Sequence, residues 1–245
     1  MIRIYTFLCL FLLTSVAFAD DYYEKGVQAY GSGQYEEAVD WFRKSAEAGY
    51  DDGQYIYGLL YERGQVIEQD YRVATEWYRK AANQGHLDAA NNLGKIYDAV
   101  AAATTDQAEA KKYYEEAVYW YRQAAEDGLL QAQANLALMY AGGTGIEKDH
   151  KKAVEWWQKA ANQGDPRSMF NLGAAYANGQ GVSKDLMEAY AWMYLANGGT
   201  SFDFSGYQVT VDYSAQVAQL EEILDQDSIK QGRARAAEIH AQVMQ

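Results

Sequence analysis

The residues that most often carry out chemistry in proteins are few in this sequence, and they form no recognised motif. Three histidines, His86, His150 and His240, lie far apart along the chain, and none belongs to a His-Glu-x-x-His zinc motif. Cys9 is the only cysteine, so neither a disulfide within the chain nor a cysteine-based zinc site can form. No Gly-x-Ser-x-Gly nucleophile motif is present. The sequence therefore predicts no catalytic residues, no metal site and no cofactor, and the protein is not expected to be an enzyme.

Two further patterns could serve chemistry but have simpler structural explanations. Residues Gly142–Gly145 are rich in glycine, yet they lack a following Gly-Lys-Ser/Thr and a preceding strand, which favours a turn over a phosphate site. The acidic pairs Glu36–Glu37, Glu115–Glu116 and Glu221–Glu222 fall in predicted helices, where adjacent side chains point apart, which favours a solvated surface. The formal charge of −13, from 34 acidic and 21 basic residues, argues against a nucleic-acid partner.

The first 19 residues have the pattern of a secretory signal peptide. Arg3 is followed by an apolar run over residues 4–13 and then by Ala17-Phe18-Ala19, the small-x-small pattern of a cleavage site. We expect cleavage after Ala19, a mature N-terminus at Asp20, and an exported protein, periplasmic or secreted, of bacterial origin. The alternative is an uncleaved anchor, although the run is shorter than the roughly 20 residues of a membrane span. No second apolar run in the sequence is long enough to span a bilayer.

A repeat of 36 residues organises the rest of the chain. Tryptophans recur at intervals of 36, 43, 36 and 36 residues, and glycines and tyrosines recur at the same intervals of 36, 43 and 36. A series of intervals shared by three residue types indicates internal repeats, and the longer interval indicates one insertion of seven residues. The recurring residues are Trp41, Trp77, Trp120, Trp156 and Trp192; Gly49, Gly85, Gly128 and Gly164; and Tyr61, Tyr97, Tyr140 and Tyr176.

Each repeat contains two amphipathic helical patterns. Within Gly53–Tyr61 the core residues have the spacing i, i+4, i+7 and i+8, which is one face of a helix, and the pattern recurs in three later repeats. The second pattern contains the tryptophan and ends at the recurring glycine, which fits a left-handed C-cap. A short glycine loop joins the two helices. Its aspartates, which are expected to cap the second helix, are Asp70, Asp149 and Asp185.

The repeat at residues 86–128 departs from this pattern. Its glycine loop is replaced by the alanine-rich segment Ala99–Asp106. Because alanine favours helix, we expect both helices to be longer here and to meet at a turn near Thr104–Asp106. The insertion fits either a functional protrusion or a tolerated change, since loops accept added length at small cost.

The repeat pattern stops after Gly199. Thr200–Gln208 is predicted to be a loop with the aromatic anchors Phe202, Phe204 and Tyr207. Two helical stripes follow, with Asp227 expected to cap the second helix, and both helices are expected to cover the open end of the repeat array. The stripes consist of Tyr213, Val217, Leu220 and Leu224, and of Ile229, Gly232, Ala236, Ile239 and Val243.

Together these motifs resemble one known family. The patterns Ala-x-x-x-Leu-Gly-x-x-Tyr, Gly-x-Gly-Val/Ile-x-x-Asp and Ala-x-x-Trp-Tyr/Trp-x-x-Ala-Ala-x-x-Gly, over about Tyr50–Gly199, are similar to those of the Sel-one-like (Sel1-like) repeat family, a relative of tetratricopeptide repeats. The resemblance implies an all-α fold, an α-solenoid (superhelix) of antiparallel helix pairs, here with a C-terminal helical cap. Gly33–Ala38 is closer to a tetratricopeptide turn, so its helix pair is interpreted as an N-terminal cap.

The predicted domain organisation follows from these boundaries. It consists of a signal peptide at 1–19, a tetratricopeptide-like capping helix pair at 20–49, repeats at 50–85, 86–128, 129–164 and 165–199, and a loop with capping helices at 200–245.

The first helix of each pair carries the predicted binding surface, because these helices form most of the concave surface of a solenoid. On the face opposite the core the repeats differ from one another, whereas their core positions agree. This variety fits partner recognition, and it also fits neutral variation. The candidate partner-binding residues are Tyr55, Leu59, Glu62, Asn91, Lys95, Asp98, Leu138 and Phe170, with Tyr55 and Phe170 the candidates for stacking on a ligand.

The resemblance implies a non-enzymatic scaffold or adaptor that is exported and binds one or more protein partners through its concave face. One alternative is a periplasmic or secreted binder of cell-envelope glycan such as peptidoglycan. Another is a β-lactamase-like or other cell-wall enzyme, an activity described for secreted, cysteine-rich members of the family. The lack of cysteine after Cys9 argues against that enzyme.

Overall fold

The computed structural model describes residues 19–197, 200–202 and 208–243. Several residues of the predictions above lie outside the described part: Ala17 and Phe18 of the cleavage site, the loop anchors Phe204 and Tyr207, and the side chain of Phe202. Apart from one short two-stranded sheet, the described chain is an all-α solenoid built of packed helix pairs, as predicted. It divides into two compact units at Ala99/Val100, and each unit is described by itself.

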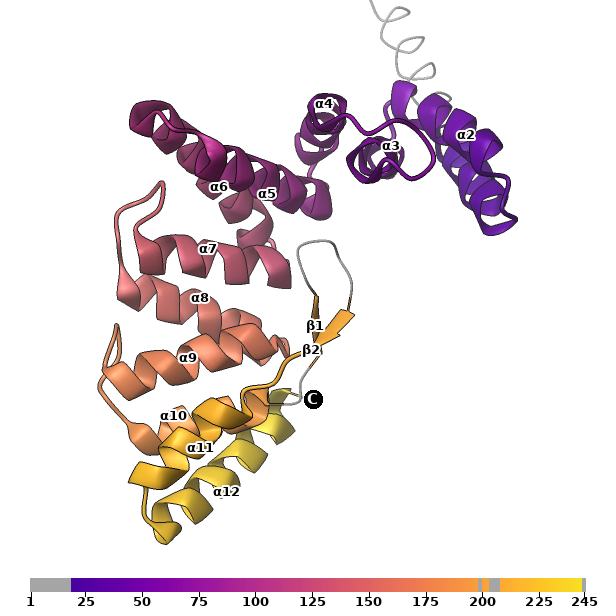
Figure 1. Cartoon of the computed structure of the whole chain (residues 1–245). Helices are drawn as coiled ribbons and strands as arrows, with labels where there is room; N and C mark the ends of the chain where they lie inside the picture. Colours follow the sequence, from indigo (N-terminus) through magenta and orange to yellow (C-terminus); the bar gives the residue numbers. More distant parts are fainter. Residues whose placement is uncertain (1–18, 198–199, 203–207, 244–245) are drawn as a thin grey trace, which may run out of the picture. The chain divides into compact units, whose positions relative to one another are not determined.

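The first unit contains a helix over residues 19–31, here called the N-terminal helix. It is followed by α2 (Tyr35–Glu47), α3 (Asp51–Arg63), α4 (Tyr71–Ala82) and the larger part of α5 (Leu87–Ala103) (Figure 1). Helix α3 packs against both α2 and α4. The N-terminal helix is held near its start, where the buried Ser45 hydroxyl donates a hydrogen bond of 2.6 Å to the carbonyl oxygen of Ala19.

The second unit continues the helix pairs and ends in a helical cap. Its elements are the end of α5, α6 (Gln107–Glu126), α7 (Leu130–Gly142), α8 (His150–Asn162), α9 (Pro166–Asn178), α10 (Leu186–Ala196), β1 (Thr200–Phe202), β2 (Gln208–Thr210), α11 (Ser214–Ile223) and α12 (Gln226–Val243). Figure 1 shows α7, α8, α9 and α10 stacked in chain order. The turn around the insertion is as predicted, because α5 ends at Ala103 and the Asp106 side chain caps α6.

The predicted helix ends are confirmed. The recurring glycines Gly49, Gly85, Gly128 and Gly164 have φ between 91° and 96°, the left-handed region in which a side chain is strained. The side chains of Asp70, Asp149 and Asp185 each accept hydrogen bonds from two backbone N–H groups in the first turn of the helix that follows.

The recurring tryptophans divide into two groups. Trp120 and Trp192 are buried, whereas Trp41, Trp77 and Trp156 are half-buried at the helix surface. A lysine three residues later covers each half-buried ring, with Lys44, Lys80 and Lys159 Nζ at 4.1, 3.5 and 3.7 Å from the ring centroids. The tryptophan excess is therefore core packing in part and cation–π surface packing in part.

A pair of glutamines at two helix-pair junctions was not anticipated from the sequence. In the first unit, Gln84 Nε2 donates to the Gly49 carbonyl oxygen at 3.0 Å and to Gln54 Oε1 at 2.8 Å. In the second unit, Gln163 Nε2 donates to the Gly128 carbonyl oxygen at 3.1 Å and to Gln133 Oε1 at 2.8 Å. Each pair ties the end of one helix pair to the next and satisfies a carbonyl group that the left-handed turn leaves without a helical partner.

Two predictions for the C-terminal segment are corrected by the structure. Part of the predicted loop at Thr200–Gln208 forms a two-stranded antiparallel hairpin, in which Thr200 pairs with Thr210 and Phe202 with Gln208. Threonine, phenylalanine and valine favour extended strands, which accounts for the pairing. Helix α12 is capped by Asp225, not Asp227, because the Asp225 side chain accepts a hydrogen bond of 2.7 Å from the Ser228 N–H.

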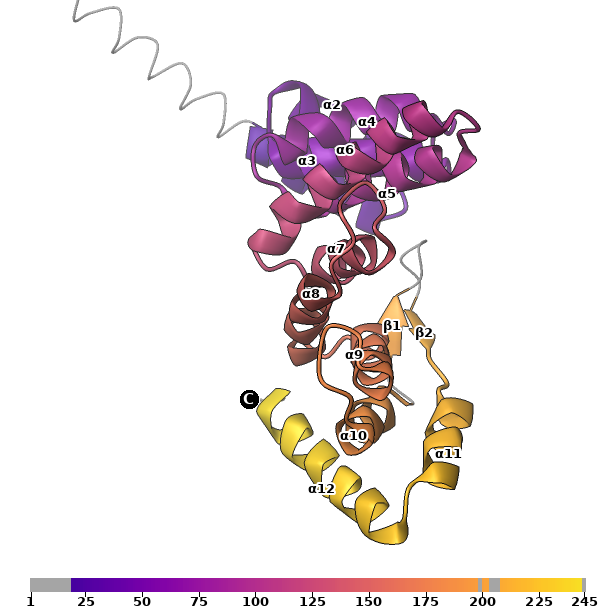
Figure 2. The same cartoon turned by 90° about the vertical axis from the view of Figure 1, so that its left-hand side faces the viewer.

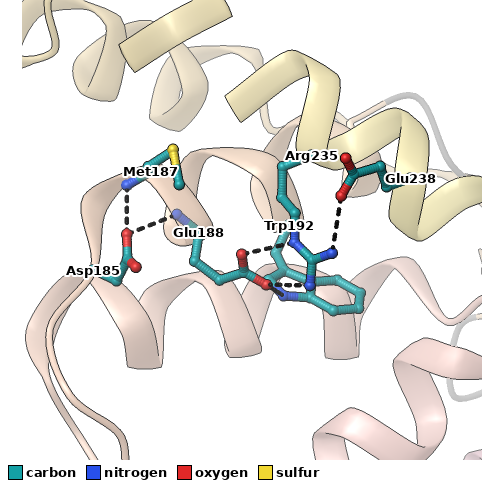
Figure 3. Close-up of polar contacts among 6 residues, drawn as sticks. All are labelled: Asp185, Met187, Glu188, Trp192, Arg235 and Glu238. Carbon is teal, nitrogen blue, oxygen red and sulfur yellow. Dashed lines mark hydrogen bonds and ion pairs between the residues drawn. The ribbon is translucent and has the colours of Figure 1, made fainter. Parts of the chain in front are cut away.

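The two predicted stripes of the cap are confirmed, because they face inward on α11 and α12. Both helices contact α10 and form a V around its end (Figure 2). Figure 3 shows the polar contacts that fasten α12 to α10. Glu188 accepts a hydrogen bond from Trp192 Nε1 at 3.0 Å and pairs with Arg235 Nε at 3.0 Å, while Arg235 also pairs with Glu238.

Candidate functional site

An apolar groove of about 370 Å³ lies in the first unit, between the N-terminal helix and α3. We call it the N-terminal groove. Its lining residues are Tyr23, Val27, Tyr30 and Gly31 of the N-terminal helix, Phe42 of α2, Ile56, Leu59, Leu60 and Arg63 of α3, and Gln65 and Val66 of the following loop. The volume lies in the range of about 300–1,000 Å³ that is usual for small-ligand pockets, so it admits a few side chains of a partner.

The walls of the groove are exposed, whereas its floor is part of the core. Val27 is 46% exposed and Tyr30 is 42% exposed, while Phe42 and Leu60 are buried beneath them. Large apolar side chains that face water next to one another mark interaction sites more often than isolated ones do. The groove therefore offers a partner an apolar surface that the chain itself does not cover in the described part.

Aromatic contacts hold the groove in shape. The Tyr23 ring lies 5.9 Å from Phe42 and 5.4 Å from Tyr50, measured between ring centroids, and Tyr30 makes an edge contact with Tyr35 at 5.1 Å. Gly26 allows the N-terminal helix to approach α2 closely, because a Cβ at this position would lie 2.7 Å from the Phe42 ring. The groove walls are thus fixed before any partner arrives, which reduces the entropic cost of binding.

The two ends of the groove differ in charge. At the Tyr23 end, burial and the nearby carboxylates of Asp52 and Glu24 raise the pKa of the Tyr23 hydroxyl. At the other end, α3 finishes with Arg63, and Gly64, with φ of 62°, turns the chain so that Gln65 and Val66 complete the lining. Arg63 is exposed, and it forms neither a hydrogen bond nor an ion pair with any residue that the structure describes.

Of the predicted partner-binding residues in α3, Leu59 lines the N-terminal groove and the other two do not. The Tyr55 ring stacks on His86 with 4.4 Å between centroids, and burial raises the pKa of Tyr55 to about 12. Glu62 accepts a hydrogen bond from the Tyr78 hydroxyl of α4. Tyr55 therefore connects α3 to the start of the next helix pair, and Glu62 connects α3 to α4 of its own pair.

The predicted residues of α5 are buried or half-buried. Asn91 is buried, and Lys95 and Asp98 are half-buried. Desolvation raises the pKa of Asp98. The role predicted for these three residues in partner binding stays a prediction.

The predicted residues of the second unit have contrasting environments. Leu138 in α7 is 51% exposed. Phe170 in α9 stacks on Tyr213 with 4.2 Å between centroids and 13° between planes, and it packs against the core formed by α10, α11 and α12. One face of the Phe170 ring is therefore occupied by the chain itself.

The sequence prediction missed the groove residues of the N-terminal helix, although a signal for them exists. Ala29 precedes Ala38 by nine residues, whereas the equivalent Tyr61 precedes Ala74 by 13, so the first turn is four residues shorter. When this difference is allowed for, Tyr23, Val27 and Tyr30 take the repeat positions of Tyr55, Leu59 and Glu62. They were missed because the shorter turn moved them out of the 36-residue frame.

His86 has a structural role rather than a chemical one. Its Nε2 lies 3.2 Å from Asp52 Oδ1, and its Nδ1 accepts a hydrogen bond of 3.2 Å from the Ala89 N–H at the start of α5. Both ring nitrogens are thus engaged, and the ring is covered by Tyr55. In the part of the chain that the structure describes, no group of three metal-ligating side chains is present. No described helix is both long enough and apolar enough to cross a membrane.

Comparison with protein families matches most of the chain to one repeat. The Sel1 repeat model matches residues 16–50, 51–86, 87–129, 130–165 and 166–197. The first match covers the helix pair that was interpreted above as a tetratricopeptide-like cap, so five repeats are found where the intervals predicted four. No curated protein sequence matches the chain.

Comparison with solved structures supports the same fold. A Sel1 repeat protein from Oxalobacter formigenes is 32% identical with a TM-score of 0.63, and the match covers 73% of this chain and 70% of that one. A protective antigen of uropathogenic Escherichia coli with an SLR fold is 26% identical with a TM-score of 0.55. That match covers 95% of this chain but 54% of the antigen, so the chain spans about half the antigen's length. PilF of Pseudomonas aeruginosa, 19% identical with a TM-score of 0.51 over 92% of this chain and 90% of PilF, shares the fold alone.

Proposed function

The chain belongs to the Sel1 repeat family, and from this premise we propose that it is a non-catalytic adaptor that binds another protein through the N-terminal groove. Sel1 and tetratricopeptide-like repeat proteins are generally scaffolds for protein interaction. The groove gives this general role a place in the chain. The observation that carries the proposal is the exposure of Val27 and Tyr30 directly above a buried apolar floor.

The energetics of the groove suit a protein segment. Covering an apolar side chain completely stabilises a complex by about 1.5–3 kcal/mol, so two or three partner side chains in the groove can support specific binding. Because Tyr23 and Phe42 are already packed against each other, little side-chain entropy is lost when the partner binds.

We also propose that the protein is exported. Arg3, the apolar run at residues 4–13 and Ala17-Phe18-Ala19 support a signal peptide that is cleaved after Ala19. In the described chain Ala19 is buried and its carbonyl oxygen accepts the Ser45 hydrogen bond, so cleavage after Ala19 would remove that contact. Intact mass spectrometry of the protein purified from its host tests this proposal. Retention of residues 1–19 would contradict it.

Paired variants test the binding proposal, because the repeat offers a matched control. Val27→Asp combined with Leu59→Asp places two carboxylates in the groove. Leu138 occupies the repeat position of Leu59 in the second unit and is exposed, so Leu138→Asp makes outside the groove the same single change that Leu59→Asp makes inside it. Circular dichroism and thermal unfolding would verify that each variant folds.

Affinity capture from the native envelope then compares the three proteins by quantitative mass spectrometry. We expect wild type and Leu138→Asp to retain the same partner and the groove variant to lose it by at least tenfold, since each apolar contact that is replaced by a charge costs more than about 1.4 kcal/mol. Equal retention by all three proteins would contradict the proposal. Retention of peptidoglycan by wild type, with loss in the groove variant, would assign the groove to the glycan alternative instead.

A further inference from the structure

One end of the N-terminal groove lies at the C-terminus of α3, and the charge there defines the partner more closely. Arg63 lines the groove, is exposed and has no ion-pair partner among the described residues. Some other cations of the same unit have carboxylate partners, as Lys25 has in Asp21 and Arg43 has in Asp40 and Glu47, and Lys44 and Lys80 lie over tryptophan rings. In a chain of net charge −13, an arginine left without a carboxylate beside an apolar surface is suited to receive one from a partner.

The opposite end of the groove gives the site a direction. Arg63 is the charged side chain among the described lining residues and attracts a negative group, whereas the Tyr23 end of the lining carries no cation. A partner segment with apolar side chains and a single acidic side chain therefore fits in one orientation, with its carboxylate at the Arg63 end. An apolar surface next to the guanidinium also limits access of water, which strengthens the pairing relative to a fully exposed ion pair.

We propose that the partner segment is an internal stretch of a protein that presents apolar side chains to Val27, Tyr30 and Leu59 and an aspartate or glutamate side chain to Arg63. This inference rests on the proposed function and names the chemistry of its partner. The polar side chains that this end of the lining offers are those of Arg63 and Gln65. A guanidinium on a long side chain suits the carboxylate of an acidic side chain in an internal stretch, whereas capture in a nest of backbone N–H groups is a recurring mode for free C-terminal carboxylates.

The test is selection of peptides from a phage-displayed library of random 12-residue sequences. The baits are the full chain, Arg63→Glu, the groove variant Val27→Asp/Leu59→Asp, and Arg72→Glu as the control. Arg72 is highly exposed in the same unit and does not line the groove, so it undergoes the same charge reversal elsewhere. Thermal unfolding of each bait verifies that Arg63→Glu does not unfold α3.

Wild type and Arg72→Glu should select apolar peptides with Asp or Glu at a fixed offset, and Arg63→Glu should select the same apolar pattern with Lys or Arg in place of the acid. A selected peptide, made with an acetylated N-terminus and an amidated C-terminus, should lose about three- to tenfold in affinity when its acid is changed to the amide. It should lose the same factor with Arg63→Gln, and no further factor when both changes are combined.

The outcomes separate the two proposals. Selection of the same peptides by wild type and Arg63→Glu, with loss in the groove variant, would overturn the acidic partner and leave the groove as a protein-binding site. Selection of the same peptides by wild type and the groove variant would contradict the proposed function itself. A last outcome would also overturn the proposed acidic side chain. It is displacement of the selected peptides by laurate, a fatty acid with an apolar chain and one carboxylate, when the selected peptides either contain no acidic side chain or bind through a free C-terminal carboxylate.

Discussion

The first and last repeats use the same helix positions in opposite ways. In the first unit, the face formed by Tyr23, Val27 and Tyr30 meets that of α3 in a groove that remains open at Val27 and Tyr30. In the second unit, the equivalent face of α9 is covered, because Phe170 stacks on Tyr213 at the start of α11. The repeat position alone therefore does not decide whether a residue binds a partner. The elements packed against that position decide it.

Side-chain size explains the difference. The positions of Tyr55, Leu59 and Glu62 in α3 are occupied by Phe170, Ala174 and Ala177 in α9. These three residues pack against the core of the cap, and two of them are small enough to let the cap come close. On the N-terminal helix the same positions carry the larger residues Tyr23, Val27 and Tyr30, and all three line the groove.

The largest expected effect comes from a truncation in the core of the C-terminal cap, which covers α9 and is called the closed end below. Leu220 in α11 is buried in the cap core, so Leu220→Ala should lower the free energy of unfolding by about 2–5 kcal/mol through lost burial and the cavity that remains. Urea denaturation measures the loss, and amide hydrogen exchange should show reduced protection at residues 214–243. Leu59→Ala at the open groove is the control and should cost about 1 kcal/mol, because Leu59 is already half-solvated. Equal losses in the two variants would show that the two faces do not differ as described.

Close helix approach at the two ends gives the next largest effect. A Cβ at Gly232 of α12 would lie 2.6 Å from the Tyr190 ring, and one at Gly26 would lie 2.7 Å from the Phe42 ring. Gly232→Ala and Gly26→Ala should each cost about 1–2 kcal/mol, because the clash outweighs the better helix propensity of alanine. Since Phe42 lines the groove, Gly26→Ala should also weaken binding of a groove peptide, measured by fluorescence polarisation. Gly232→Ala should leave that binding unchanged, and a stabilised Gly232→Ala would contradict the packing described for α12.

A double-mutant cycle measures how strongly the chain covers its own last repeat. Phe170→Ala and Tyr213→Ala should show a coupling energy of about 0.5–1.5 kcal/mol, since their rings are stacked at 4.2 Å. The control is Tyr213→Phe, which keeps the ring and should keep the coupling. Strict additivity of the two alanine variants would mean that the Phe170 face is as available to a partner as the N-terminal groove.

The repeats, the helix boundaries and the turn chemistry could be predicted from the sequence, because each depends on local residues. Asp70 caps α4, and Gly85 ends a helix pair in a left-handed turn. Both features depend only on neighbouring residues in the sequence, so they recur in each repeat with the same local pattern. The Asp225 cap was misplaced by two residues, since both Asp225 and Asp227 offer the same acceptor and only the packed register of α12 distinguishes them.

The candidate site was predicted only in part, because it depends on contacts between distant residues. Leu59 was identified from its variable repeat position, and it does line the groove. Phe170 satisfied the same criterion, but Tyr213 lies 43 residues further along the chain and no periodicity relates the two. Val27 and Tyr30 were missed because a turn shorter by four residues shifts the N-terminal helix out of the repeat frame.

The charges that hold the closed end give the smallest expected effect, and they can be separated by pH. The Tyr190 hydroxyl donates to Glu221 Oε1 at 2.6 Å, and Arg233 donates to the same oxygen at 2.9 Å. These hydrogen bonds lower the pKa of Glu221, and the one from Tyr190 contributes most. A carboxyl with a lowered folded pKa binds protons less readily when folded than when unfolded. Its stabilisation is therefore complete above the unfolded pKa of about 4.3 and is lost as the pH falls through the folded pKa.

Glu221→Gln should consequently be less stable than wild type by a constant amount between about pH 6 and pH 8, and the difference should shrink below about pH 4.3. Urea denaturation at each pH measures it. The control, Glu222→Gln, removes the neighbouring exposed carboxylate of α11 and should remain within about 0.5 kcal/mol of wild type throughout. A difference for Glu221→Gln that does not change with pH would mean that lost packing, and not charge, is responsible. The closed end would then be held by its apolar contacts alone. In that case side-chain size, without any contribution from charge, would account for the difference between the covered face of α9 and the open N-terminal groove.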